Sequence, residues 1–242
     1  NNEAICLAAR NGHIEIVAFL LEDKRVDLSN RFALPVRYAI QNGHLEIVRL
    51  LLNCEVIYPK HMLFDAFIKA IIGGHIKTVT FLLENDIIDP SNENYKAIRV
   101  AAEYGHLDLF ILLTDCYHSL HLLSDVFFDS FIRAIRTGHL KIVKYLLEKE
   151  MVDLSYEDNL SMLQAVKYGH IDIVKLLLEY DLSNTRDIIS TACFYGHYDI
   201  VKLLLTYKRI YLTEDHNGLF RVAVIEGYFE LVKLLLSNSL RV

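Results

Sequence analysis

One short motif recurs along the whole chain and constrains its fold more than any other feature. A glycine followed by histidine occurs seven times, and an eighth copy reads Gly-Tyr. The eight glycines are Gly12, Gly43, Gly74, Gly105, Gly138, Gly169, Gly196 and Gly227. Successive glycines are 31, 31, 31, 33, 31, 27 and 31 residues apart. A period of this length across all 242 residues predicts a repeat architecture in which each repeat stacks on its neighbours.

The residues around each glycine indicate two short helices per repeat. The residue four before the glycine is always alanine, and the residue eight after it is always leucine. In the first repeat we expect a helix over residues 3–10, ended by Gly12 in the left-handed conformation, and a second helix over residues 14–22. One face of this second helix gathers its apolar side chains, Ile16, Val17, Leu20 and Leu21. Because two-turn helices are unstable alone in water, the repeats must bury these faces against one another, which predicts an all-α solenoid.

The repeat motif resembles a known family. The stretch AARNGHIEIVAFLL at residues 8–21, and the related stretches at residues 101–107 and 165–170, are similar to the ankyrin repeat. The resemblance covers the whole chain and implies a right-handed stack of helix-turn-helix repeats. We therefore expect residues 1–242 to form a single ankyrin-type solenoid of eight repeats centred on the eight glycines. The Thr-Pro-Leu-His opening of the family's first helix survives only as Pro35, and the spacing of 31 is shorter than the family's 33. Shortened hairpin connectors are expected.

Composition excludes several classes of protein. Hydrophobic residues make up 53% of the chain, which is too apolar for disorder. The formal net charge of -6 provides no basic field for nucleic acid. No apolar run approaches the length that spans a bilayer, and the four cysteines lie far apart. These features predict an intracellular protein, cytoplasmic rather than nuclear and not secreted, with no nucleic-acid or membrane partner.

Residues with catalytic or metal-binding chemistry follow the repeat instead of forming a site. Seven of the histidines belong to the Gly-His motif, and we expect them to hydrogen-bond adjacent repeats. Cys116, His118 and His121 are the only local cluster of potential ligands, but zinc normally takes four ligands with a more regular spacing. We interpret this cluster as polar residues of an inserted loop. Since phosphate-loop, nucleophile-elbow and zinc-protease motifs are also missing, the sequence predicts no enzymatic activity, cofactor or metal.

The repeats differ most where a partner would bind. In proteins that resemble this one, the concave face is lined by the two residues before each glycine and by the connector tips. Here these positions hold Tyr104, Arg136, Lys167, Tyr168, Phe194 and Tyr195, and the longest connector adds Tyr117. Tyrosine and arginine are enriched at the energetic centres of protein interfaces. These residues are therefore predicted to bind a protein partner; the alternative is that each tyrosine packs along its neighbouring repeat and only lines the groove.

The two ends carry a further expectation. Isolated solenoids need terminal repeats with a polar outer face, and neither end of this sequence provides one. We expect the native protein to continue beyond one or both ends, or its ends to stack on another chain. The predicted function is a non-catalytic protein–protein interaction module that binds its partner on the concave face. The alternatives are an assembly element that stacks through its uncapped ends, and the substrate-recruiting part of a larger adaptor or effector.

Overall fold

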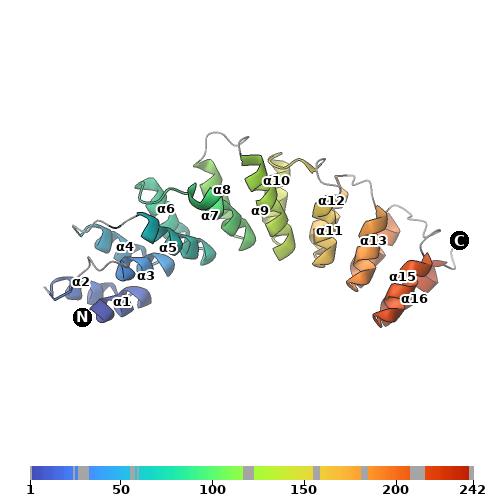
Figure 1. Cartoon of the computed structure of the whole chain (residues 1–242), viewed down its shortest axis with the longest axis horizontal. Coiled ribbons are helices and arrows are strands. Elements are labelled where there is room, and N and C mark those ends of the chain that lie inside the picture. The colour runs from blue at the N-terminus through green and yellow to red at the C-terminus, as the bar shows by residue number, and fades with distance from the viewer. Residues whose placement is uncertain are drawn as a thin grey trace. The chain divides into compact units, whose positions relative to one another are not determined.

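A computed structural model of the chain describes residues 2–23, 25–26, 33–54, 58, 60–116, 123–154, 159–180, 185–207 and 216–239. These residues form eight pairs of helices, and none of them lies in a β-strand (Figure 1). The first helices are α1 (Asn2–Asn11), α3 (Leu34–Gln41), α5 (Lys60–Ile72), α7 (Asn92–Glu103), α9 (Ser124–Thr137), α11 (Leu160–Lys167), α13 (Thr185–Phe194) and α15 (His216–Ile225). The second helices are α2 (Ile14–Leu21), α4 (Leu45–Leu52), α6 (Ile76–Glu84), α8 (Leu107–Asp115), α10 (Leu140–Glu148), α12 (Ile171–Leu178), α14 (Tyr198–Tyr207) and α16 (Phe229–Ser239). The predicted all-α repeat fold is confirmed.

The helices are organised in two compact units, Asn1–Val126 and Phe127–Val242. In the N-terminal unit, α1, α3, α5 and α7 pack in sequence against one another, and α2, α4, α6 and α8 form a parallel series. In the C-terminal unit the same relation joins α11, α13 and α15, and it joins α10, α12, α14 and α16. Each unit therefore has one layer of first helices and one layer of second helices. A single continuous solenoid over residues 1–242 stays a prediction.

The turn between the two helices explains the Gly-His motif. All eight repeat glycines have positive φ, between +72° at Gly74 and +83° at Gly138, where a Cβ atom would be strained. The amide of the next residue then donates to the carbonyl of the motif's alanine, as in His44 N to Ala39 O at 2.9 Å. The carbonyl of the same histidine accepts the first hydrogen bond of the second helix, from Val48 N at 3.0 Å. The histidine backbone thus ends one helix and begins the next.

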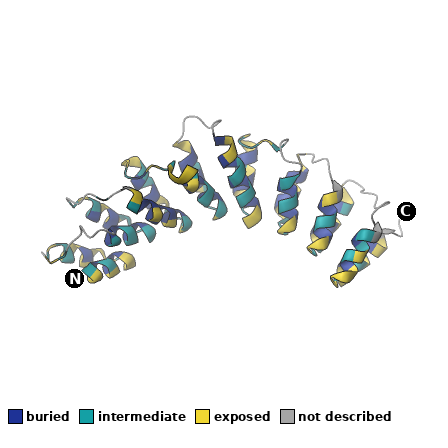
Figure 2. Cartoon of the chain, in the orientation of Figure 1, coloured by how far each residue is buried: buried dark blue, intermediate teal, exposed yellow. Residues whose placement is uncertain are grey.

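The core lies between the two helix layers and between successive repeats. The motif's alanine is buried in every repeat, and so is the valine or phenylalanine five residues after the glycine, except at Val232, where it is half-buried. Figure 2 shows that the helices bury the side facing their neighbours and expose the other side. Burial of these small and branched side chains removes apolar surface from water, which is the main stabilising term for helices too short to persist alone.

The histidine rings join consecutive repeats. His44 Nε2 donates to the carbonyl oxygen of Arg10 at 3.0 Å, and His106 Nε2 donates to that of Ile72 at 2.9 Å. In the C-terminal unit, His170 Nε2 reaches Arg136 O at 3.1 Å and His197 Nε2 reaches Lys167 O at 3.0 Å. The predicted structural role of these four histidines is confirmed.

The eighth repeat keeps this contact with a different side chain. Tyr228 stands where the other repeats have histidine, and its hydroxyl lies 3.5 Å from the carbonyl oxygen of Phe194. Tyrosine and histidine both present a flat ring with a donor at its far end, so the same carbonyl can be reached. The change from Gly-His to Gly-Tyr therefore preserves the link to the preceding repeat.

Among the first helices, α5 and α9 exceed the predicted two turns by the most. α5 has 13 residues and α9 has 14. The reason is additional apolar residues upstream of the motif, because Leu63 and Phe64 in α5 and Phe127 in α9 are buried. The connectors at residues 27–32, 55–57, 117–122, 155–158, 181–184 and 208–215 lie outside the described residues, so the shortened hairpins stay a prediction.

The partly buried ring of His75 makes the stability of the chain depend on pH in a predictable direction. Its ring lies between two glycines, since a Cβ atom would come within 2.5 Å of the ring at Gly43 and within 2.6 Å at Gly73. Burial lowers the pKa of His75 below its ordinary value, and the neighbouring charges of His44 and His106 lower it further. The unfolded chain therefore takes up a proton at a higher pH than the folded chain does. The contribution of His75 to stability is complete above the unfolded pKa of about 6.5 and decreases as pH falls below it.

The test compares urea unfolding of the native chain with that of the His75→Asn variant between about pH 7.5 and about pH 5.5. We expect the native chain to lose more unfolding free energy over this range than the variant, because asparagine does not titrate. The exposed His61 provides the control, because His61→Asn makes the same substitution away from any repeat glycine. If the unfolding free energy of the native chain and that of His75→Asn changed equally with pH, His75 would not be the cause of the pH dependence.

Candidate functional site

Five of the predicted binding residues lie at the ends of consecutive first helices in the C-terminal unit. They are Arg136 from α9, Lys167 and Tyr168 from the end of α11, and Phe194 and Tyr195 from the end of α13. All five are exposed, and the side chain of Phe194 is exposed to 54%. They occupy the two positions before the repeat glycine, so the helix spacing of the repeat brings them next to one another. We call these five residues the aromatic-basic strip.

The basic side chains of the strip lie over its tyrosine rings. The guanidinium carbon of Arg136 is 5.6 Å from the ring centre of Tyr168, and its Nε donates to the Tyr168 hydroxyl at 3.3 Å. Lys167 Nζ is 5.7 Å from the ring centre of Tyr168 and 5.8 Å from that of Tyr195. A cation within about 6 Å of a ring face is attracted by the ring quadrupole. These contacts favour one arrangement of two side chains that would otherwise be mobile.

The tyrosines are themselves supported by the histidines that join the repeats. Tyr168 stacks on His170 with ring centres 6.5 Å apart, and Tyr195 stacks on His197 at 6.4 Å. Phe194 meets the edge of Tyr195 at 5.1 Å. Because both histidines are hydrogen-bonded to the preceding repeat, they hold the stacked tyrosine rings in place. The tyrosines do pack along the repeats, as the alternative interpretation held, and they also present exposed ring surface.

The charge of the strip is not neutralised within the described part of the chain. Neither Arg136 nor Lys167 forms an ion pair with a described carboxylate. Elsewhere in the same unit, Lys175 pairs with Asp172 at 3.1 Å and Lys233 pairs with Glu230 at 3.0 Å. The strip therefore combines two positive charges, neither of them paired with a carboxylate of the described residues, with exposed aromatic surface in a chain whose net charge is negative.

The other two predicted residues are not placed in the strip. Tyr104 follows α7 in the N-terminal unit, where its side chain is exposed, and it belongs to a different compact unit from the strip. Tyr117 lies outside the described residues. The pairing of each cation with a tyrosine ring was not predicted from the sequence. One signal for it was present, because Arg136 and Lys167 both stand two residues before the glycine of their repeats.

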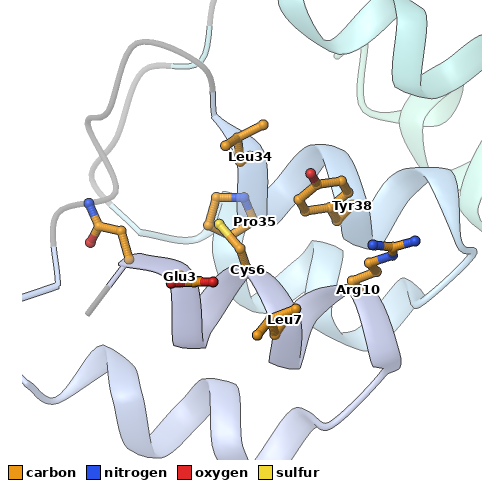
Figure 3. Close-up of a pocket in the computed structure, with 8 residues that line it drawn as sticks. Glu3, Cys6, Leu7, Arg10, Leu34, Pro35 and Tyr38 are labelled. Carbon is orange, nitrogen blue, oxygen red and sulfur yellow. The ribbon is translucent and has the colours of Figure 1, made fainter.

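A hollow that was not predicted from the sequence lies between α1 and α3. It has a volume of about 380 Å³. Figure 3 shows Cys6 and Pro35 in its middle, Glu3 toward one end and Arg10 with Tyr38 toward the other. Burial and the charge of Glu3 raise the pKa of the Cys6 thiol. A thiol of raised pKa is a poor nucleophile, so this hollow carries no activated cysteine.

Other chemistry is sparse in the described residues. Within them, no group of three or more histidine, cysteine, aspartate or glutamate side chains could hold a metal ion. His118 and His121 of the predicted polar loop are outside that part of the chain. Burial raises the pKa of the Cys193 thiol to about 12, as expected of a buried cysteine that acts as a small apolar residue. None of the described helices has the length and apolar character needed to cross a membrane.

Comparison with known proteins identifies the family. The family model "Ankyrin repeats (3 copies)" matches residues 1–60, 118–187 and 162–242. The chain belongs to the ankyrin-repeat family. Ankyrin repeats generally mediate protein–protein interactions, and the family is typically non-catalytic. Among curated proteins, the comparison of sequences finds no match.

The ankyrin fold is also found among solved structures. The crystal structure of the human ASB11 ankyrin repeat domain matches with a TM-score of 0.58 and 18% sequence identity. The match covers 71% of this chain and 82% of that chain. At this identity the similarity shows a shared fold, and function must be argued from the surface of this ankyrin chain.

Proposed function

We propose that this ankyrin-repeat chain is a protein-recognition module, and that its aromatic-basic strip binds an acidic segment of a protein partner. The observation that carries the proposal is that Arg136 and Lys167, which form no ion pair with a carboxylate in the described part of the chain, lie over exposed tyrosine rings. Ankyrin repeats generally bind proteins, which supports the class of partner. The cations and aromatic rings of the strip support the proposal that the bound segment is acidic.

The geometry suits carboxylates next to an apolar side chain. The Nε of Arg136 donates a hydrogen bond to the Tyr168 hydroxyl. The two terminal nitrogens of Arg136 are therefore left to bind a carboxylate of the partner. Lys167 adds a second positive charge one repeat away. Phe194, beside them, offers apolar surface to a leucine- or phenylalanine-sized side chain. Because the rings already hold the cations in place, less conformational entropy is lost on binding.

Selection from a random peptide library displayed on phage tests this proposal. With the native chain as bait, we expect the enriched peptides to carry aspartate or glutamate near an apolar residue. The charge-reversed variant Arg136→Glu, Lys167→Glu should bind these peptides at least about 10-fold more weakly, because each carboxylate would then face a like charge. Binding is measured by fluorescence polarisation of the synthetic peptides.

The matched control reverses two charges outside the strip. Lys141 and Lys144 are exposed on α10, and changing both to glutamate alters the net charge by the same amount. This control variant should bind the selected peptides with nearly native affinity. Selected peptides without acidic residues, or equal losses in both variants, would contradict recognition of an acidic segment by the strip.

A second candidate function is self-association through exposed apolar side chains. It is favoured by large apolar side chains that are exposed on the first and last repeats, Phe19 in α2 and Phe229 in α16 among them. Exposed apolar patches mark interaction sites when they are larger than single scattered residues. Association of the purified chain that increases with concentration would support this role.

A further inference from the structure

The hollow between α1 and α3 depends on short or uncharged side chains at two positions of the repeat. Cys6 stands six residues before the glycine of the first repeat, and Leu34 stands nine residues before the glycine of the second. Both line the hollow, together with Pro35 and Tyr38. The side chain of Cys6 ends at its sulfur atom, and it therefore leaves the space between the two helices open.

The same two positions are filled between α3 and α5. When the repeats are aligned on their glycines, Arg37 takes the position of Cys6, and Asp65 takes that of Leu34. Arg37 Nη2 lies 3.4 Å from Asp65 Oδ2, and Lys69 Nζ lies 3.2 Å from the same oxygen. Long side chains joined by ion pairs thus occupy the place that is hollow one repeat earlier. The hollow is therefore a consequence of the side chains that the first two repeats present to each other.

The floor of the hollow, formed by Cys6, Leu34 and Pro35, carries no charge. Pro35 is buried, and the other two residues are half-buried. Burial, together with the charge of Glu3, raises the pKa of the Cys6 thiol, so the thiol stays protonated at neutral pH. The volume of about 380 Å³ lies in the range of about 300–1,000 Å³ that is typical of ligand-binding pockets. The floor thus offers apolar surface to a large apolar side chain.

The two ends of the hollow carry opposite charges (Figure 3). Glu3 lies toward one end and Arg10 toward the other. The guanidinium carbon of Arg10 is 5.9 Å from the ring centre of Tyr38, and Arg10 forms no ion pair with a carboxylate among the described residues. A carboxylate of a ligand is therefore attracted at the Arg10 end and repelled at the Glu3 end. These charges give a bound segment one direction.

We infer that the hollow between α1 and α3 binds a leucine- to phenylalanine-sized side chain of a protein partner, whose neighbouring acidic residue lies at Arg10. The apolar side chain would cover Cys6, Leu34 and Pro35, and the carboxylate would accept hydrogen bonds from the guanidinium. Because Arg10 is exposed, the partner's backbone can continue past the hollow in solvent. The site lies in the N-terminal unit and does not depend on the aromatic-basic strip.

Selection of peptides against a chain whose strip is disabled tests this site by itself. The bait is the full chain with Arg136→Glu and Lys167→Glu, so that acidic peptides are not enriched through the strip. From a random phage library we expect peptides with a large apolar residue directly beside an aspartate or glutamate. No enriched peptides, or peptides without this pair of residues, would overturn the inference and leave the proposal for the strip untouched.

Two substitutions in the bait should weaken binding of the synthetic peptides, measured by fluorescence polarisation. Cys6→Phe fills the hollow and should weaken binding at least about 10-fold, because the apolar side chain of the peptide is excluded. Arg10→Glu should also weaken binding at least about 10-fold, because the carboxylate of the peptide then faces a like charge. A peptide with lysine in place of its acidic residue should recover part of the affinity for Arg10→Glu.

Matched controls make the same substitutions elsewhere. Cys116→Phe alters an exposed cysteine at the end of α8, and Lys77→Glu reverses an exposed charge on α6. Both should bind the peptides with nearly native affinity, and circular dichroism checks that all four variants are folded. Equal affinities of Arg10→Glu and Lys77→Glu would overturn the inference even if Cys6→Phe failed to fold.

The reactivity of Cys6 reports directly whether the hollow is occupied. N-ethylmaleimide labels the thiols of the bait, and mass spectrometry of proteolytic fragments follows each cysteine separately. A saturating peptide should slow the labelling of Cys6 several-fold and leave that of the exposed Cys116 unchanged. A bound peptide that does not slow the labelling of Cys6 would have its site elsewhere, which would overturn the inference.

Discussion

Replacing Gly169 with alanine is expected to lower the free energy of unfolding by about 2–4 kcal/mol, and the same change at Gly227 by only about 1–2 kcal/mol. The two glycines have nearly the same backbone conformation, with φ of +77° and +76°. The left-handed strain of an alanine is therefore similar at both. At Gly169, however, the new Cβ atom would come within 2.7 Å of the His197 ring. The ring would have to move, and its hydrogen bond to Lys167 O would be lost.

Urea unfolding followed by far-ultraviolet circular dichroism measures this difference. The Gly227→Ala variant is the matched control, because it keeps the strain and omits the collision. Equal losses of stability in the two variants would mean that the contact between the His197 ring and Gly169 adds nothing to stability, and that only the backbone strain of the new alanine matters. A larger loss at Gly169 would show that the histidine of one repeat and the glycine of the preceding repeat stabilise the stack together.

Replacing Tyr168 and Tyr195 together with alanine should lower affinity for the selected acidic peptides by about 100-fold or more, since each such anchor contributes about 2 kcal/mol or more when it is a hot spot. The loss has two sources. The rings themselves offer exposed apolar surface to the peptide, and they also hold the cations of Arg136 and Lys167 in place. Isothermal titration calorimetry with the synthetic peptides provides the measurement.

Conservative variants separate the two contributions. Changing both tyrosines to phenylalanine keeps the rings and removes the hydroxyl that accepts from Arg136 Nε, so affinity should fall only a few-fold. Tyr104→Ala, which alters an equally exposed ring in the other unit, tests whether that tyrosine takes part in binding. Native affinity in the double alanine variant, with helicity and melting temperature unchanged, would reject the strip as the binding surface.

Much of the fold could be predicted because the same sequence pattern recurs in all eight repeats. The alanine, the glycine and the leucine recur at fixed offsets, and each offset has a physical reason in the folded chain. The alanine carbonyl accepts the hydrogen bond that ends the first helix, as at Ala39, and the glycine adopts a φ that a Cβ atom would strain. Helix lengths were predicted less well, because the buried residues that extend α5 and α9 lie outside the repeated motif.

The candidate site was predicted only in part. Helix spacing was enough to place Arg136, Lys167, Tyr168, Phe194 and Tyr195 at successive first-helix ends. The pairing of Arg136 and Lys167 with particular rings depends on side-chain conformations that the sequence does not specify. The hollow between α1 and α3 escaped prediction because it forms between residues of two repeats that share no motif.

The sequence by itself determined the number of repeats, the two helices in each and the left-handed turn between them, because these depend on local conformation and on a periodic apolar pattern. Only the tertiary structure decided where the histidine rings lie, and which cations have no carboxylate partner among the described residues. The physical reason is that these properties arise from contacts between repeats. Such contacts depend on side chains 28 to 34 residues apart in the chain, whose packing no single repeat contains.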